Sequence, residues 1–510
     1  MKIKSILCFC TLSALLCGCQ PQSDSIASES TETTSVAETT TISSAENTPS
    51  QKELNFPSYE EIQSEYPDKT VLVWVIEETL YERNYPFRTA EVNAYLDEKG
   101  YDFAVCFVPI RGDEQTYTAQ VTDMINAGEQ VDIIYASFTT SGEAGSNSYH
   151  KYIYNGLFAP LDPYFDTAEG KILYELMPEN HWEALRVNDH IYGVDGSMQT
   201  LSLDYGYYVN AELAEKYGYD IHSPLEEQIA ILDQVKSTEQ KCDVFAAWEN
   251  YTSFSYYANI QTITSAVYWD DTEHRAKIAP DHVQYTDRLK LFYTLKQKGL
   301  LARPEMQDTF FILQTNFCSG AGLVWEADET ISVPYGENTV EAYPLFPKDT
   351  AVRQAYCATG ISTQSQHPDM AFRLLALTQT DADLNNLLTY GVEGEDYELV
   401  DGIVSQVQNR VSLDRFANYM ICHPHQSNGF SAEDYRTIFA SAAVSEDISF
   451  AFDGREMIPQ TQAIAEVLDT FTLSTDQSLD EILNALKMKL EQAGIQEVID
   501  ECNRQYLQGQ

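Results

Sequence analysis

The segment from Thr70 to Phe138 constrains the fold more than any other part of the chain. Three short apolar runs lie at 71–76, 103–108 and 131–135, separated by stretches whose apolar residues have helical spacing. Apolar runs that alternate with amphipathic helices predict a parallel sheet covered by helices on both faces. Ligands of such sheets bind outside the carboxyl ends of the strands, so the residues after each run are candidates for a binding site.

Two of these runs are followed directly by candidate ligand contacts. Glu77 and Glu78 follow the first run, and Ser137 and Phe138 follow the third. Trp74 lies inside the first run, where a core position is expected.

The length and charge of the chain narrow the classes of function. Its 510 residues suit two α/β lobes of about 200–250 residues each. The formal net charge is −47, from 78 acidic and 31 basic residues. Phosphate binding needs clustered Lys and Arg, so the charge argues against nucleic acid and against docking on anionic lipid. We interpret the charge as a source of solubility rather than as a site for a cation.

The first residues indicate export. Lys2 and Lys4 precede an apolar run of 12 residues, Ile6–Cys17, which is too short to span a bilayer and is typical of a secretory signal. The run continues into Gly18 and Cys19, and this end resembles a bacterial lipobox. We therefore expect a lipoprotein signal peptide over residues 1–18 and lipidation of Cys19; an ordinary signal peptide cleaved nearby is the alternative.

A polar tether is expected after the anchor, over residues 19–66. Ser23–Ser50 contains 15 Ser or Thr and no Lys or Arg, so it cannot bury enough apolar surface to fold. Six further cysteines follow, without any C-x-x-C pair. An exported protein permits disulfides, but apolar surroundings favour free thiols, and the sequence leaves the choice open.

Several short motifs occur in an order that resembles one protein family. The chain is similar to the extracellular solute-binding proteins of ABC importers, in the group that includes maltose-binding protein. The matching motifs are Leu157–Asp162, Val187–Val194, Tyr207–Asn210, Phe317–Trp325 and Tyr390–Tyr397. The last of these, Tyr-Gly-Val-Glu-Gly-Glu-Asp-Tyr, resembles a segment of one lipoprotein subgroup, where it could bind ligand or shape a turn.

The resemblance implies a type II two-lobed α/β fold, with a mostly parallel sheet in each lobe and about three crossovers at the hinge. It assigns residues 67–197 and 335–380 to lobe 1, and residues 198–334 and 381–510 to lobe 2. It also implies a monomer that captures a solute between the lobes, most often a carbohydrate, and delivers it to the permease of a Gram-positive cell.

Sugar binding requires planar polar groups for hydroxyl pairs and aromatic faces for the ring. In this family the crossover and the second lobe supply some of them. Asp195 and Ser197 lie in the expected crossover, and Trp248 and Trp325 are aromatic candidates of the second lobe.

Two other classes of function remain open. A secreted glycan hydrolase would use paired carboxylates, but 78 acids produce such pairs by chance. The sequence contains no G-x-S-x-G or H-E-x-x-H motif, and we expect neither an enzyme nor a cofactor. An adhesion or scaffold lipoprotein is the second alternative. We expect no metal at His423-Pro424-His425, whereas a structural calcium near Glu393–Asp396 is left open.

Overall fold

The computed structural model describes most of the chain after residue 55. The described residues are 56–78, 88–111, 114–136, 148–196, 205–220, 223–239, 243–246, 261–264, 266–302, 311–317, 331–335, 338–344, 351–352, 358–406, 418, 420–424, 433, 436, 443–444, 447 and 449–509. The expected signal peptide, Cys19 and nearly all of the tether lie outside them.

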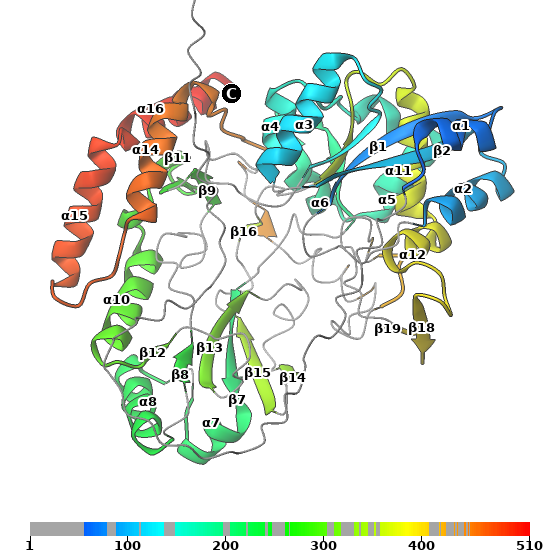
Figure 1. Cartoon of the computed structure of the whole chain (residues 1–510). Helices are drawn as coiled ribbons and strands as arrows, with labels where there is room; N and C mark the ends of the chain where they lie inside the picture. The colour runs from blue at the N-terminus through cyan, green and yellow to red at the C-terminus, as the bar shows by residue number, and fades with distance from the viewer. Residues whose placement is uncertain are drawn as a thin grey trace, which may run out of the picture. The chain divides into compact units, whose positions relative to one another are not determined.

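The first sheet contains the three predicted apolar runs (Figure 1). Its strands, in the order β2-β1-β3-β17-β6, are Phe103–Arg111, Thr70–Glu78, Ile133–Ala136, Ala358–Ile361 and Gly193–Val194. β1 pairs in parallel with β2 and β3, whereas β17 is antiparallel to both β3 and β6. Residues 71–77 are all buried. Successive strand residues point to opposite faces, so both faces of β1 are covered, as predicted.

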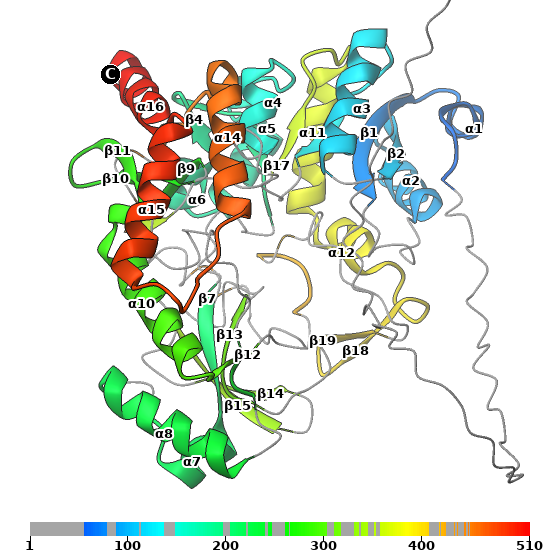
Figure 2. The ribbon, with the colours of Figure 1, turned by 60° about the vertical axis from the view of Figure 1, so that its left-hand side comes forward.

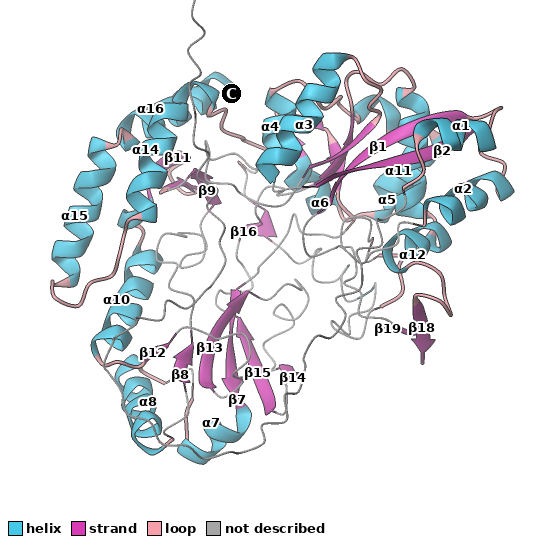
Figure 3. Ribbon diagram, in the orientation of Figure 1, coloured by secondary structure: helices cyan, strands magenta, loops and turns pink. Residues whose placement is uncertain are grey.

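Helices enclose this sheet (Figure 3). They are α1 (Tyr59–Glu65), α2 (Thr89–Glu98), α3 (Glu114–Ala127), α4 (Ser148–Tyr154), α5 (Ala168–Leu176), α6 (Glu179–Leu185), α11 (Pro368–Thr380) and α12 (Ala382–Tyr390). Apolar residues of these helices and the sheet form one hydrophobic cluster, which we call the first core. Ile62 of α1 instead packs in a small cluster with Val71, Ala104 and Cys106. Trp74 is 1% exposed and belongs to this core, as expected.

The second large sheet has six strands. In the order β12-β8-β13-β7-β15-β14 they are Leu301–Ala302, Asp243–Ala246, Phe311–Phe317, Tyr205–Asn210, Asn338–Pro344 and Ile331–Tyr335. Only the pairings of β8 are parallel; β7, β13, β14 and β15 pair with one another in antiparallel fashion. The expectation of a mostly parallel sheet is therefore wrong here. One reason is the two-residue connection between β14 and β15, which can join only antiparallel strands.

A second hydrophobic cluster, the second core, is built around helices. They are α7 (Ala211–Tyr217), α8 (Leu225–Thr238), α10 (Val283–Gln297), α14 (Ile458–Asp469), α15 (Leu479–Gln492) and α16 (Ile495–Gly509). A three-stranded sheet of β11 (Arg275–Ile278), β10 (Val267–Asp270) and β9 (Gln261–Thr264) contributes the buried residues Trp269 and Ala276. Figure 2 shows α14, α15 and α16 packed side by side.

Small pairings complete the described structure. They are the β4–β5 hairpin (Arg186–Val187 and His190–Ile191), the β18–β19 hairpin (Tyr397–Val400 and Ile403–Gln406) and the pair β16–β20 (Ala351–Val352 and Ala443–Val444). Asn188 and Asp189 have φ values of 48° and 67°, as a two-residue turn of a β-hairpin requires between β4 and β5. The lobe boundaries proposed from the sequence stay a prediction; α12 places Leu384 and Leu388 in the first core.

Candidate functional site

Three strands of the first sheet end at the same edge. β1 and β3 run in parallel, and β6 has the same direction as β3 because both are antiparallel to β17. β1 ends with Glu77 and Glu78, and β6 is followed directly by Asp195. We call this the carboxyl edge of the first sheet. It is the place at which α/β sheets bind ligands.

Two of the predicted ligand contacts at this edge are buried carboxyl groups. Glu77 is 5% exposed and Asp195 is 6% exposed. Ionised groups are costly to bury, so a carboxyl group held at a strand end requires polar partners, which the protein or a ligand can supply. For Glu78 only the backbone is described, and it continues β1.

The other predicted ligand contacts cannot be placed. Ser137 and Phe138 come directly after the last residue of β3, and Ser197 is two residues beyond Asp195. These three residues, together with Trp248 and Trp325, lie outside the described residues. The structure therefore brings the ends of β1, β3 and β6 together, while the role of these five side chains stays a prediction.

An ion pair that the sequence did not reveal joins the start of α2 to the turn after α12. Arg88 is the N-cap residue of α2 and follows the undescribed stretch that begins after Glu78. Its Nε lies 2.7 Å from Oδ2 of Asp396, and its Nη2 lies 2.6 Å from Oδ1 of the same carboxylate. The Asp396 side chain is only 2% exposed. This two-pronged pair fixes where the chain from the carboxyl edge returns to the fold.

Asp396 of this pair belongs to the Tyr-Gly-Val-Glu-Gly-Glu-Asp-Tyr motif, and its contacts show what the motif does structurally. Oδ2 of Asp396 also accepts a hydrogen bond from the Val392 backbone N–H at 2.9 Å, which closes a turn after α12. Gly391 has φ 86°, and a Cβ there would lie 2.1 Å from Oδ2 of Asp396, so only glycine fits. Of the two roles left open for the motif, the described contacts support the shaping of a turn.

A second contact ties α2 to α12. The hydroxyl of Tyr95 donates to the Asp381 carboxylate at 2.8 Å. Burial raises the pKa of Tyr95, and its bond to the Asp381 carboxylate raises it further, so the phenol stays protonated. Asp381 also caps α12 by accepting from the backbone N–H of Leu384. Helix α2 is thus held at two points, its N-cap Arg88 and Tyr95.

A buried acid, Asp447, contacts aromatic residues of the second core. Asp447 accepts from Trp269 Nε1 at 2.9 Å and from the Tyr506 hydroxyl at 2.6 Å, and its Oδ2 lies 2.7 Å from Nδ1 of His274. Burial alone would raise the pKa of Asp447, but its hydrogen bonds with Tyr506, His274 and Trp269 hold it below the usual value. These contacts tie β10, the turn after it and α16 together.

The chain segment after Asp447 passes between the two cores. Ala451 belongs to the first core, whereas the next residue, Phe452, belongs to the second. The carbonyl of Ser449 accepts from the backbone N–H of Asn188 in the β4–β5 turn. We call residues 449–455 the crossover segment.

The described cysteines bear on the thiol prediction. Cys106 and Cys502 are buried and form no disulfide. Burial raises the pKa of Cys106 to about 11, so its thiol is unreactive at neutral pH. In the part of the chain that the structure describes, no three His, Cys, Asp or Glu side chains are grouped to hold a metal. None of the described helices is long and apolar enough to cross a membrane.

Similarities to known proteins agree with this architecture. The chain is 23% identical over 434 residues to a carbohydrate ABC transporter substrate-binding protein of Streptococcus pneumoniae; the match covers 76% of this chain and 82% of that protein. The N-glycan transport solute binding protein (NgtS) of the same species aligns with a TM-score of 0.63 and 18% identity, over 86% of this chain and 99% of that one.

An extracellular solute-binding protein from Bifidobacterium longum subsp. infantis aligns with a TM-score of 0.58 and 12% identity, over 86% of this chain and 98% of that one. The fold is that of a type II solute-binding protein. The recognition made from the sequence motifs is confirmed, and all three of these similar proteins are solute-binding proteins rather than enzymes.

A family model described as a domain of unknown function (DUF3502) matches residues 448–508. The matched region begins at the crossover segment and includes α14, α15 and α16. This solute-binding fold therefore carries, at its C-terminus, a module that is shared with other proteins.

Proposed function

We propose that the chain is the extracellular, lipid-anchored substrate-binding component of an ABC importer, and that its solute is a carbohydrate or oligosaccharide. The relative in Streptococcus pneumoniae is named for carbohydrate, and NgtS has been crystallised with Man1GlcNAc and Man5GlcNAc. The convergence of the β1, β3 and β6 ends, with Glu77 and Asp195 buried at that edge, carries the proposal.

The proposal assigns roles that follow from the sequence. Cys19 carries the lipid, the polar tether extends the protein outward from the membrane, and the permease that receives the solute is encoded elsewhere. The ligand contacts are Glu77, Glu78, Ser137, Phe138, Asp195 and Ser197, with Trp248 and Trp325 as stacking platforms. Carboxylates that accept from two hydroxyls of one ring would give such a site its specificity.

A ligand screen on the purified chain tests the binding function. The panel contains monosaccharides, maltose-type and mannose-containing oligosaccharides, and peptides as the comparison class. At 100 times its dissociation constant a true ligand adds about 2.7 kcal/mol of stability, which a thermal-shift assay detects easily. Asp195→Asn should weaken binding on the order of tenfold or more, because a charged hydrogen-bond acceptor is lost.

Two results would contradict the proposal. One is recovery of a cleaved oligosaccharide after incubation, which chromatography would reveal and which a hydrolase requires. The other is the absence of stabilisation by any sugar of the panel when a peptide stabilises the chain. Lipidation is tested separately: Cys19→Ala should release the protein from the membrane fraction without changing ligand affinity.

A further inference from the structure

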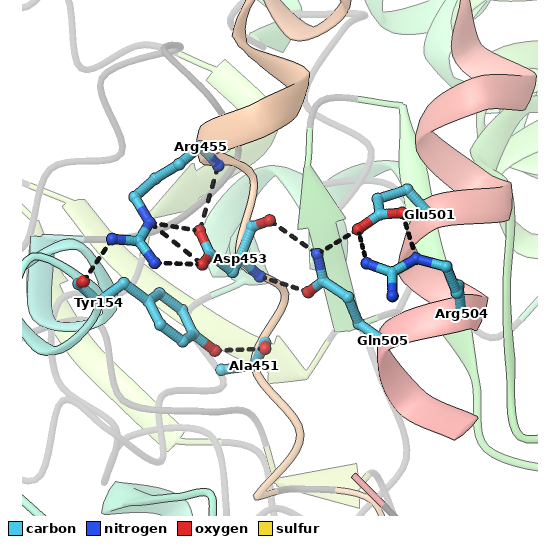
Figure 4. A network of polar contacts seen from close by, with 7 residues as sticks. All are labelled: Tyr154, Ala451, Asp453, Arg455, Glu501, Arg504 and Gln505. Carbon is cyan, nitrogen blue, oxygen red and sulfur yellow. Dashed lines mark hydrogen bonds and ion pairs between the residues drawn. The ribbon is translucent and has the colours of Figure 1, made fainter. Parts of the chain in front are cut away.

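A pocket with a volume of about 620 Å³ opens beside the crossover segment. It lies between the end of α4, the crossover segment and the C-terminal helix α16, which contribute Tyr154, Arg455 and Gln505 (Figure 4). Sites for small molecules typically have volumes of about 300–1,000 Å³. The pocket is therefore large enough for a ligand of one or two rings.

The pocket is not part of the carboxyl edge. Tyr154 ends α4, and the chain continues to Leu157, whose carbonyl accepts from the backbone N–H of Thr363. The preceding residue, Ser362, donates its N–H to the carbonyl of Asp132, which lies just before β3 begins. This end of α4 therefore lies at the amino edge of the first sheet, opposite Glu77 and Asp195.

The side chains around the pocket are held in place before any ligand arrives (Figure 4). Nη1 of Arg455 donates to the carbonyl of Tyr154 at 2.6 Å, and Nε of Arg455 lies 2.9 Å from Oδ1 of Asp453. The Gln505 amide makes two bonds with the backbone of Asp453, each at 2.9 Å. The Tyr154 hydroxyl donates to the carbonyl of Ala451. Groups ordered in advance lose little entropy when they bind a ligand.

The charges of the lining nearly cancel. Asp453, Glu456 and Glu501 contribute three negative charges, and Arg455 and Arg504 contribute two positive ones, which leaves −1. Hydrogen bonds from Arg504 lower the pKa of Glu501 to about 2, so that carboxylate stays ionised. Burial alone would raise the pKa of Asp453, but its bonds with Arg455 lower it. An anion in the pocket would be repelled by three carboxylates, and a cation would be repelled by two guanidiniums.

A neutral molecule rich in hydroxyls suits such a lining better than either ion. Each hydroxyl both donates and accepts, so it can bond with carboxylates and guanidiniums at once. The rings of Tyr154 and Phe450 add apolar surface to the lining, against which the C–H groups of a sugar can pack. We propose that this pocket is a second binding site, for a neutral mono- or disaccharide, separate from the carboxyl edge and independent of the transported solute.

Ligand-observed NMR on the full chain tests the second site. The probes are mannose, N-acetylglucosamine and maltose, with glucuronate and glucosamine as charged analogues. The double variant Glu77→Gln/Asp195→Asn should retain binding of at least one neutral probe, because it changes only the opposite edge. Both charged analogues should bind more weakly, on the order of tenfold, a difference of about 1.4 kcal/mol.

Two pocket variants complete the test. Gln508→Trp and Glu456→Phe place a large ring at an exposed lining position and should each lower the retained affinity on the order of tenfold or more. Ile172→Trp, at an exposed position on α5, is the matched control and should leave binding unchanged. The proposal is overturned if no neutral probe binds the folded double variant, or if both pocket variants bind like the control.

Discussion

The two cores differ in the buried acid–base groups whose pKa the fold shifts. The first core holds His150 and His181 fully buried, and burial lowers the pKa of His150 to about 4 and that of His181 to about 3, so both are neutral. The second core instead places a carboxylate, Asp447, at the centre of three hydrogen-bonding contacts. The first core therefore contains two histidines that must not become charged, and the second contains a carboxylate that must stay charged.

Acid should therefore destabilise the first core at a higher pH than the second. This is the largest effect we expect. A histidine with a lowered folded-state pKa gives its full stabilisation above its unfolded pKa of about 6.5, and loses it as the pH falls toward the folded value. Each of His150 and His181 should cost about 3 kcal/mol between pH 6.5 and pH 4. The lowered pKa of Asp447 preserves the second core until the pH falls below its unfolded value, about 3.8.

The measurement is urea unfolding at several pH values, followed by proteolysis and mass spectrometry. It assigns the loss of stability to peptides of each core. His150→Phe removes one titrating group and should flatten the pH dependence of the first core by roughly half. Equal loss of protection in both cores at pH 5 would contradict the comparison.

The second prediction concerns the ion pair at the start of α2. Asp396→Ala removes one partner of a pair whose carboxylate is buried and should cost about 4 kcal/mol of unfolding free energy. Glu395→Gln is a matched control, because Glu395 contacts the same guanidinium at 3.0 Å but is 64% exposed. This substitution should cost about 0.5 kcal/mol of unfolding free energy. Similar melting temperatures for the two variants would show that burial does not decide the strength of the pair.

The third prediction addresses the second core alone. Asp447→Ala leaves the indole N–H of Trp269 and the hydroxyl of Tyr506 without their acceptor and should cost about 3 kcal/mol. Protection from proteolysis should fall in α16 and the β9–β11 sheet and stay unchanged in β1 and β2. A matching loss in the first sheet would mean that the two cores unfold as one unit.

The smallest effect is expected where the two cores share a chain segment. Tyr154→Phe removes only the hydroxyl that bonds to the carbonyl of Ala451 and should cost about 1 kcal/mol. Tyr164→Phe, in the first core away from the crossover segment, is the control. If proteolysis reports the Tyr154 loss only in peptides of the first core, then the bond does not connect the cores.

The sequence predicted the first sheet better than the second. The strands of the first sheet are apolar runs that can be recognised from neighbouring residues alone. The run at 71–76 lies within β1, and the run at 103–108 lies within β2. The antiparallel pairing in the second sheet depends on how β7, β13 and β15 come together from distant segments. Strand periodicity contains no information about such order.

The candidate site was predicted in part. Glu77 could be proposed because it follows an apolar run, and Asp195 because the family resemblance places it in the crossover. The topology places both at one edge. The pairing of Arg88 with Asp396 spans 308 residues, and no spacing rule selects one partner among 78 acids. Such pairs become visible only when the fold brings them together. Ser137, Phe138, Ser197, Trp248 and Trp325 stay predictions.

The crossover segment has a mechanical consequence. Ala451 is anchored in one core and Phe452 in the other, so a single peptide bond separates the two anchors. A trans peptide holds adjacent Cα atoms about 3.8 Å apart, and this distance provides no slack. Along this segment, movement of one core against the other must therefore be accommodated by rotation about backbone torsions, because the chain has no slack to extend.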